Sequence, residues 1–188
     1  MKKTFVTAVS AGMLAMVIAM PVALADDRVC RGTIGAATTD NIVVPQGATC
    51  NLNGTKVEGN IEVKSGAKLY AKGVRVDGNV QSEGFRVVQV SQRSFVGGDI
   101  QLDKGRSGGN SFIGGSTVDG NLQLKQNYAK ITAQNNVIQG DLQAESNRGG
   151  LVFKSNRIFE NFQCKQNNPA PTGGGNIAGD KEGQCARL

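Results

Sequence analysis

The chain has 188 residues, among them 26 glycines, seven phenylalanines and two tyrosines, and it has neither tryptophan nor histidine. The lack of histidine excludes histidine-based catalytic triads, the HExxH zinc site and an imidazole general base, and so few large side chains favour stacked repeats around a narrow core over a thick globular core. The formal net charge of +6 at pH 7 is mild; it is compatible with an anionic partner, although for most secreted domains such a charge only favours solubility.

Residues 1–25 have the pattern of a signal peptide. Lys2 and Lys3 precede an apolar stretch from Phe5 to Leu24, and Ala23-Leu24-Ala25 has the small-x-small form of a signal peptidase site. An uncleaved membrane anchor is the alternative, because the stretch is nearly long enough to span a bilayer. Cleavage leaves 19 basic and 15 acidic residues, a mature net charge of about +4, and predicts export to the periplasm or beyond the cell.

The rest of the chain repeats with a period near 20 residues, which predicts an N-terminal cap at 26–37 and a β-solenoid with a C-terminal cap at 38–188. One position is always Asn or Asp, at steps of 19 to 22 residues: Asn41, Asn60, Asn79, Asp99, Asn121, Asp141, Asn161 and Asp180. Glycine usually precedes it. Since Gly tolerates positive φ and Asn or Asp can adopt the left-handed region, we interpret this column as a structural corner.

Apolar residues flank the corner with the strand period of two. Three columns, each with one residue per coil, are expected to face inward. One directly follows the corner, from Ile42 in the first coil to Phe162 in the seventh, and one lies two positions later, from Val44 to Cys164. The third lies before the corner and consists of Val57, Val76, Val96, Val118, Ile138, Ile158 and Ile177. Pairs such as Leu69 with Ala71 suit a second wall. The pattern predicts an all-β fold, a right-handed parallel β-helix of about eight coils.

Four cysteines in an exported chain predict two disulfides. Cys50 falls in the first coil and Cys164 in the seventh, roughly 29 Å apart at about 4.8 Å per coil, which is too far for a bridge. Pairings Cys30–Cys50 and Cys164–Cys185 remain, one at each end of the stack. Capped ends favour a monomer over an end-to-end filament.

The coil motif and the ending carry a resemblance. Repeated Gly-Asn-Val-Gln and Gly-Asn-Leu-Gln, with the final segments Asn161 to Asn176 and Gly179 to Cys185, resemble a group of small exported bacterial β-helix proteins of uncharacterised function. This resemblance covers essentially the whole mature chain and implies the fold and export, but no activity. The Val-x-Gly-Asn-Ile coil motif alone is also similar to that of bactofilins, which are cytoplasmic and polymerise through uncapped ends.

Two outward columns are candidate binding residues. Glutamines recur between the inward columns at Gln81, Gln101, Gln123, Gln143 and Gln163, where their amides can bond to one another along the stack or to sugar hydroxyls. Basic residues recur at Lys56, Arg75 and Arg157, and could form a stripe for an anionic glycan. For both columns the competing interpretation is structural: a wall of mutually bonded amides, and a solvated edge that blocks aggregation.

These patterns predict an exported, non-enzymatic structural or binding module, with no cofactor, that binds an anionic polysaccharide or another envelope polymer along a flat face. The alternative is a carbohydrate-active enzyme such as a polysaccharide lyase, acting through Lys, Arg and Asp. Its carboxylates would come from Asp99, Asp141 and Asp180, but residues two coils apart are about 10 Å from each other, too far to share one ion. No metal site is expected.

Overall fold

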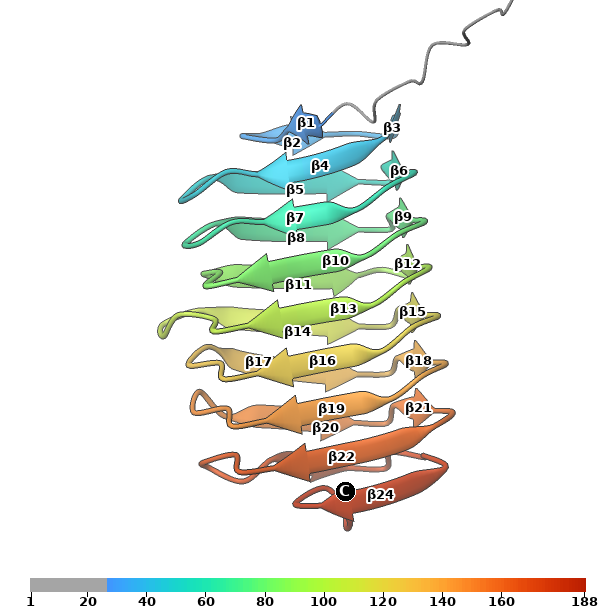
Figure 1. The fold of residues 1–188 in the computed structure, drawn as a ribbon. Coiled ribbons are helices and arrows are strands. Elements are labelled where there is room, and N and C mark those ends of the chain that lie inside the picture. Colours follow the sequence, from blue (N-terminus) through green and yellow to red (C-terminus); the bar gives the residue numbers. More distant parts are fainter. Residues whose placement is uncertain (1–26) are drawn as a thin grey trace, which may run out of the picture.

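The structure is a computed structural model that describes residues 27–188; the predicted signal peptide lies outside the described residues. The chain winds into a rod of stacked coils with three parallel sheets along its sides (Figure 1). In that view it runs leftward along the front strands, rightward along the rear strands and then down to the next coil, which is a right-handed path. The predicted β-solenoid of about eight coils is confirmed.

The front face in Figure 1 is sheet A, which contains the predicted corner and glutamine columns. Its nine strands, in spatial order, are β1 (Asp27–Val29), β4 (Asn41–Val44), β7 (Ile61–Val63), β10 (Val80–Glu83), β13 (Ile100–Asp103), β16 (Leu122–Lys125), β19 (Leu142–Glu145), β22 (Asn161–Lys165) and β24 (Asp180–Gly183).

The rear face is sheet B, in which the strands of five successive coils have five residues each. Its eight strands are β2 (Thr33–Ile34), β5 (Thr49–Asn53), β8 (Lys68–Lys72), β11 (Val87–Ser91), β14 (Asn110–Gly114), β17 (Lys130–Gln134), β20 (Leu151–Lys154) and β23 (Thr172–Gly174). Residues 27–37 therefore supply β1 and β2 as the first strands of sheets A and B.

Sheet C is the narrow third side. Its seven two-residue strands are β3 (Thr38–Thr39), β6 (Lys56–Val57), β9 (Arg75–Val76), β12 (Phe95–Val96), β15 (Thr117–Val118), β18 (Val137–Ile138) and β21 (Arg157–Ile158). The described residues contain no helix that is long and apolar enough to cross a membrane.

The core is a single column of mostly aliphatic side chains between the three sheets, with Phe85, Phe153 and Phe162 as its largest members. The two inward columns of sheet A are buried throughout, as are Leu69, Ala71 and their neighbours in sheet B. Ile177 is the exception to the predicted inward columns: it pairs with Arg157 rather than Ile158 and is 66% exposed. The last coil has one residue fewer between Asn176 and Asp180 than the coil before it has between Asn156 and Asn161, and this shift turns Ile177 outward.

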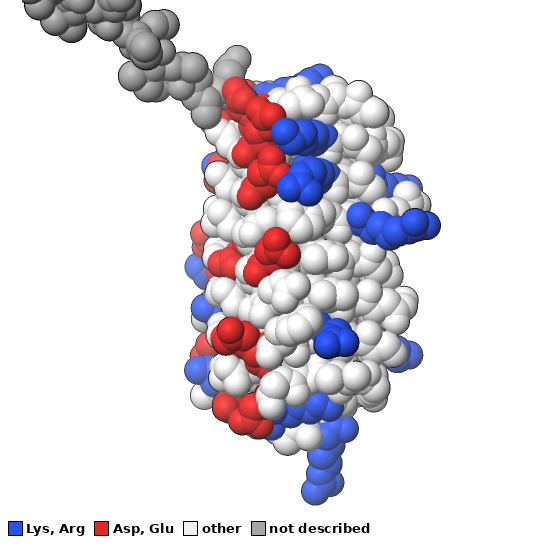
Figure 2. Space-filling model, turned by 90° about the vertical axis from the view of Figure 1, so that its right-hand side faces the viewer, with Lys and Arg blue, Asp and Glu red and all other residues white. Residues whose placement is uncertain are grey.

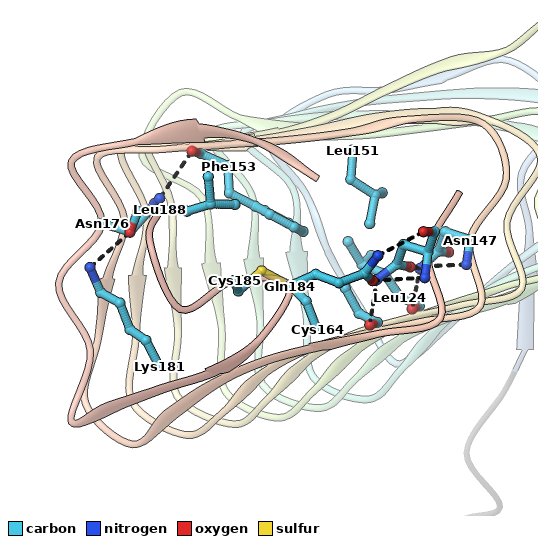
Figure 3. Close-up of a disulfide and its surroundings, with 12 residues drawn as sticks. Leu124, Asn147, Leu151, Phe153, Cys164, Asn176, Lys181, Gln184, Cys185 and Leu188 are labelled. Carbon is cyan, nitrogen blue, oxygen red and sulfur yellow. Dashed lines mark hydrogen bonds between the residues drawn. A yellow bond between two sulfur atoms is a disulfide. The ribbon is translucent and has the colours of Figure 1, made fainter. Parts of the chain in front are cut away.

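Both predicted disulfides are present. Cys30 bonds Cys50 with their Cα atoms 5.5 Å apart, and Cys164 bonds Cys185 with their Cα atoms 5.2 Å apart. All four cysteines are buried at the ends of the core. Figure 3 shows the second bridge holding the chain end across the stack, where Lys181 Nζ donates a hydrogen bond to Leu188 O. Disulfides indicate a non-reducing, exported environment.

Candidate functional site

The corner column of sheet A is a hydrogen-bonded ladder. The side-chain oxygen of each corner residue accepts a hydrogen bond from the backbone N–H of the corner residue in the next coil, from Asn41 to Asn161, with distances of 2.7 to 2.9 Å. Side-chain amides of Asn79, Asn121 and Asn161 also donate to the coil before. These residues are thus structural, and Asp180 continues the column only through strand pairing.

The glycines before the corner are there for space and not for positive φ, which corrects the sequence interpretation. Gly59, Gly78, Gly98, Gly120 and Gly140 all lie outside the positive-φ region. A Cβ at Gly140 would lie 2.5 Å from Asn121 Oδ1, and a Cβ at Gly98 would lie 2.3 Å from Asn79 Oδ1. Each glycine therefore lets the carboxamide or carboxylate of the coil before it reach the next backbone.

Two further ladders, which the sequence analysis missed, lie inside the rod. Asn127, Asn147 and Asn167 are buried between sheets A and B, and Asn136, Asn156 and Asn176 are buried between sheets B and C. Asn147 Nδ2 donates to Leu124 O at 2.9 Å and to Asn167 Oδ1 at 2.8 Å. Gln184 ends the first ladder by bonding Asn167 (Figure 3). The sequence does contain the pattern that predicts these ladders, because the asparagines of each one recur every 20 residues.

The five candidate glutamines lie side by side in sheet A, paired coil to coil from Gln81 to Gln163. Along the stack, one amide bond is formed, from Gln81 Nε2 to Gln101 Oε1 at 3.3 Å. Gln101 and Gln143 instead donate to Asp99 and Asp141 at 3.1 Å. Glu62 and Glu182 continue the column at its two ends, so this face is polar and partly acidic.

The three candidate basic residues lie around the corner from the glutamines, in one outward column of sheet C. Lys56 Nζ lies 2.6 Å from Glu58 Oε1, and Arg75 Nε lies 3.0 Å from Asp77 Oδ1. The hydrogen bond and charge of Glu58 raise the pKa of Lys56.

The two arginines of this column also contact aromatic rings: Arg75 covers the ring of Phe95, and Arg157 covers that of Phe159. Phe95, Thr117 and Val137 separate Arg75 from Arg157, so these cations form no continuous positive stripe.

Charge is instead divided between the sides of the rod. In each coil, one segment runs from the end of the sheet A strand, through the sheet B strand, to the start of the next sheet C strand. Together these segments contain no acidic residue. They contain eleven basic residues: Arg31, Lys64, Lys68, Lys72, Arg86, Arg93, Lys104, Arg106, Lys130, Arg148 and Lys154. The rest of residues 27–188 contains fourteen acidic and eight basic residues. In Figure 2, which looks onto sheet C, the visible acidic side chains lie in the half toward sheet A.

The lysines on the strands of sheet B are free of acidic partners. Lys72, Lys130 and Lys154 are exposed and Lys68 is half-buried. None of the ion pairs found within residues 27–188 includes any of the four. On the strands of sheet B, therefore, no acidic residue offsets the charge of the lysines, an arrangement that favours anions.

Features of an enzyme site are weak in the described part of the chain. No group of three or more Cys, Asp or Glu residues is arranged to hold a metal ion there. The surface depressions found are open, such as one lined by Glu62, Gln81, Glu83, Gln101 and Asp103. In it, burial raises the pKa of Asp103, whose Oδ1 is buried without a hydrogen-bond partner. Lys104 donates to neighbouring Glu83 and lowers the pKa of that carboxyl.

Comparison with models of protein families, with curated proteins and with solved structures found no match to this chain. The binding roles of the glutamine and basic columns stay predictions.

Proposed function

We propose that the protein is an exported, non-enzymatic structural or binding module, acting in the periplasm or outside the cell, that binds an extended anionic polysaccharide along one flat side. The observation that carries this proposal is the charge division of the rod, with eleven basic and no acidic residues on the side of sheet B. The likeness of its coils and ending to small exported bacterial β-helix proteins supports export.

The distribution of charge supports sheet B, rather than the glutamine column, as the proposed binding face. Sheets A and C, taken with the corner between them, carry more acidic than basic residues, and the cations Lys56 and Arg75 already have acidic partners. An anionic polymer lying there would meet repulsion, whereas on sheet B it would meet only cations. Parallel strands in register present equivalent positions at about 4.8 Å intervals along the rod, so many weak contacts can add up along one chain.

The test compares two variants with the same change of net charge. One replaces Lys68, Lys72, Lys130 and Lys154 with Gln; its control replaces Lys56, Arg75, Lys125 and Lys165 with Gln. Titration with polygalacturonate at low and at physiological salt should show binding that weakens with salt, because screening reduces the charged part. We expect the sheet B variant to lose on the order of tenfold or more in affinity and the control to bind as wild type or better.

A triple variant, Gln101, Gln123 and Gln143 to Ala, tests the glutamine column separately and is expected to bind as wild type. Equal losses in the two lysine and arginine variants would show that net charge alone, and no particular face, attracts the polymer. A wild-type protein that binds no acidic polysaccharide at either salt would overturn the proposal and leave a scaffold. Release of unsaturated sugars from the polymer would favour the lyase alternative instead.

A further inference from the structure

The middle of sheet B carries aromatic side chains between rows of cations. Its central outward column pairs Asn51, Tyr70, Gln89, Phe112, Thr132, Val152 and Thr172 in successive coils. Tyr70 and Phe112 are half-buried and lie two coils apart, with Gln89 between them. Two strand spacings are roughly 10 Å, so the two rings follow each other along the axis of the rod.

Phe112 lies down against the sheet. A Cβ built on Gly114 would lie 2.2 Å from Cζ and 2.3 Å from Cε1 of Phe112. The ring therefore leans along strand β14 and covers Gly114, which is buried although its position faces outward. Gly114 has an ordinary φ, so its lack of a side chain serves to accept the ring. The outcome is an aromatic surface close to the sheet with part of it open to solvent.

Cations lie on both sides of each ring. Lys68 and Lys72 are two residues before and two residues after Tyr70 on the same strand, where side chains point the same way. Beside Phe112, Lys130 pairs with Asn110 at one end of β14. Arg93 lies at the other end, where its backbone N–H donates to Gly115 O at 2.9 Å. Tyr70 thus lies between two lysines of its own strand, and Phe112 lies between the chain positions of Lys130 and Arg93 in the two neighbouring coils.

We infer that Tyr70 and Phe112 are stacking platforms for the sugar rings of a linear carboxylated polysaccharide, which lies along the rod on sheet B with its carboxylates between the flanking cations. This inference rests on the proposed function and adds the ring contacts and the direction of the polymer. Sugar rings present C–H groups to the negative face of an aromatic ring, and the flanking cations neutralise the acid groups. The polymer axis follows the aromatic column because the cations lie on either side of it.

A carboxylated glycan fits this surface better than a nucleic acid does. The four cations on the strands of sheet B are lysines, and five arginines lie in the turns beside the sheet; both kinds of cation can bind carboxylates. The two rings of the outward column, Tyr70 and Phe112, are roughly 10 Å apart, whereas single-stranded nucleic acids stack successive bases on aromatic side chains. The disulfides place the chain in a non-reducing compartment. A second copy of the chain is disfavoured on this face, because two such faces would bring unpaired lysines together.

The experiment uses the full mature chain, two matched ligands and two matched variants. The ligands are oligogalacturonate and its fully methyl-esterified form, which share a backbone and differ in charge, and oligo(dT) is the nucleic-acid probe. The variants are Phe112→Leu and Phe95→Leu; Phe95 is also half-buried and outward, but lies in sheet C beneath Arg75. Leucine keeps an apolar cover on the sheet and removes the ring face. Circular dichroism and the melting temperature are measured to check that both variants fold.

We expect Phe112→Leu to weaken oligogalacturonate binding on the order of tenfold, the scale of one lost ring-stacking contact, and Phe95→Leu to have no effect. Tyr70→Leu should act as Phe112→Leu does. The methyl ester should bind weakly, because its carboxylates are blocked, and its remaining affinity should still fall in Phe112→Leu.

Each contrary result has its own meaning. If wild type binds oligogalacturonate but Phe112→Leu and Phe95→Leu bind equally well, the stacking inference is wrong and the proposed function stands. If wild type binds no acidic glycan, both are wrong. If oligo(dT) binds more tightly than oligogalacturonate and needs Phe112, sheet B is a nucleic-acid surface and the glycan assignment is overturned.

Discussion

Asn121 Oδ1 accepts a hydrogen bond of 2.8 Å from the backbone N–H of Asp141, the equivalent corner residue one coil further along the rod. Asn121 also donates through Nδ2 to Asp99 Oδ1, so one side chain joins three coils. Gln123, two residues later, faces solvent in the glutamine column. The two positions allow the structural and the exposed column to be compared within one strand.

We therefore expect Asn121→Val to lower the free energy of unfolding by about 1–3 kcal/mol, because the Asp141 N–H loses its acceptor. Gln123→Val should stay within about 0.5 kcal/mol of wild type, because the half-buried Gln123 side chain points outward from the core. Thermal and urea unfolding measure both. Equal melting temperatures for the two variants would contradict the ladder's importance.

Gly140→Ala tests whether the glycines serve close packing. Its Cβ would lie 2.5 Å from Asn121 Oδ1 and 3.0 Å from Gly120 O, and we expect a loss of about 1–3 kcal/mol from overpacking. Gly35→Ala is the control, since no atom lies within 4 Å of its Cβ and its φ is not positive. Equal stability of Gly140→Ala and Gly35→Ala would contradict the close-packing role of these glycines.

The buried ladders should be more sensitive than the exposed polar columns. Asn147→Leu keeps the number and branching of the side-chain heavy atoms but removes the bonds to Leu124 O and Asn167 Oδ1, leaving several buried polar groups unpaired at about 1–3 kcal/mol each. We expect urea unfolding to show a loss of about 3 kcal/mol or more. Asn110→Leu, at an exposed position of β14, is the matched control. A variant Asn147→Leu as stable as this control would mean that the ladder contributes nothing net.

The disulfides lie at the two ends of the stack, so their reduction should loosen the ends first. Repeat proteins fray from their terminal coils, because each coil is held only by its neighbours. Hydrogen exchange followed by mass spectrometry, with and without reductant, should show faster exchange in 27–57 and 158–188 while 80–142 stays protected. Simultaneous loss of protection in the middle coils would show that the rod unfolds as one unit.

The raised pKa of Asp103 predicts how the stability of the fold depends on pH. Burial raises its pKa above the ordinary 3.8, so the folded state binds this proton more tightly than the unfolded chain does. Protonated Asp103 therefore contributes its full share of stability below about pH 3.8, and this contribution is lost as the pH rises through the folded-state pKa. Asp103→Asn should therefore melt higher than wild type at about pH 7 and equally at about pH 3. The same gain at both pH values would show that ionisation is not its cause.

Much of the fold was determined by the sequence alone. The period of 20 residues and the alternation around Ile61 or Leu122 give the coils and their inward columns, because a strand has only two faces and one must be buried. The order of the coils along the rod then leaves one feasible pairing for Cys50 and Cys164. The reason for glycine at Gly140 was not accessible, since the clash of its Cβ is with a side chain 19 residues earlier.

The binding face was decided by the tertiary structure. In the sequence, Lys68, Lys130 and Lys154 are scattered among acidic residues in a chain whose net charge is mild. The regular recurrence of basic residues in the column of Lys56 and Arg75 favours that column as the positive stripe. Winding the chain places the acidic residues of 27–188 on sheets A and C or at the corner between them, beside Lys56 and Arg75, and leaves sheet B with cations alone. A residue's electrostatic surroundings come from the coils above and below it, about 20 residues away in the chain and only about 4.8 Å away in space. Which charges reinforce and which cancel is therefore set by the three-dimensional register of the coils.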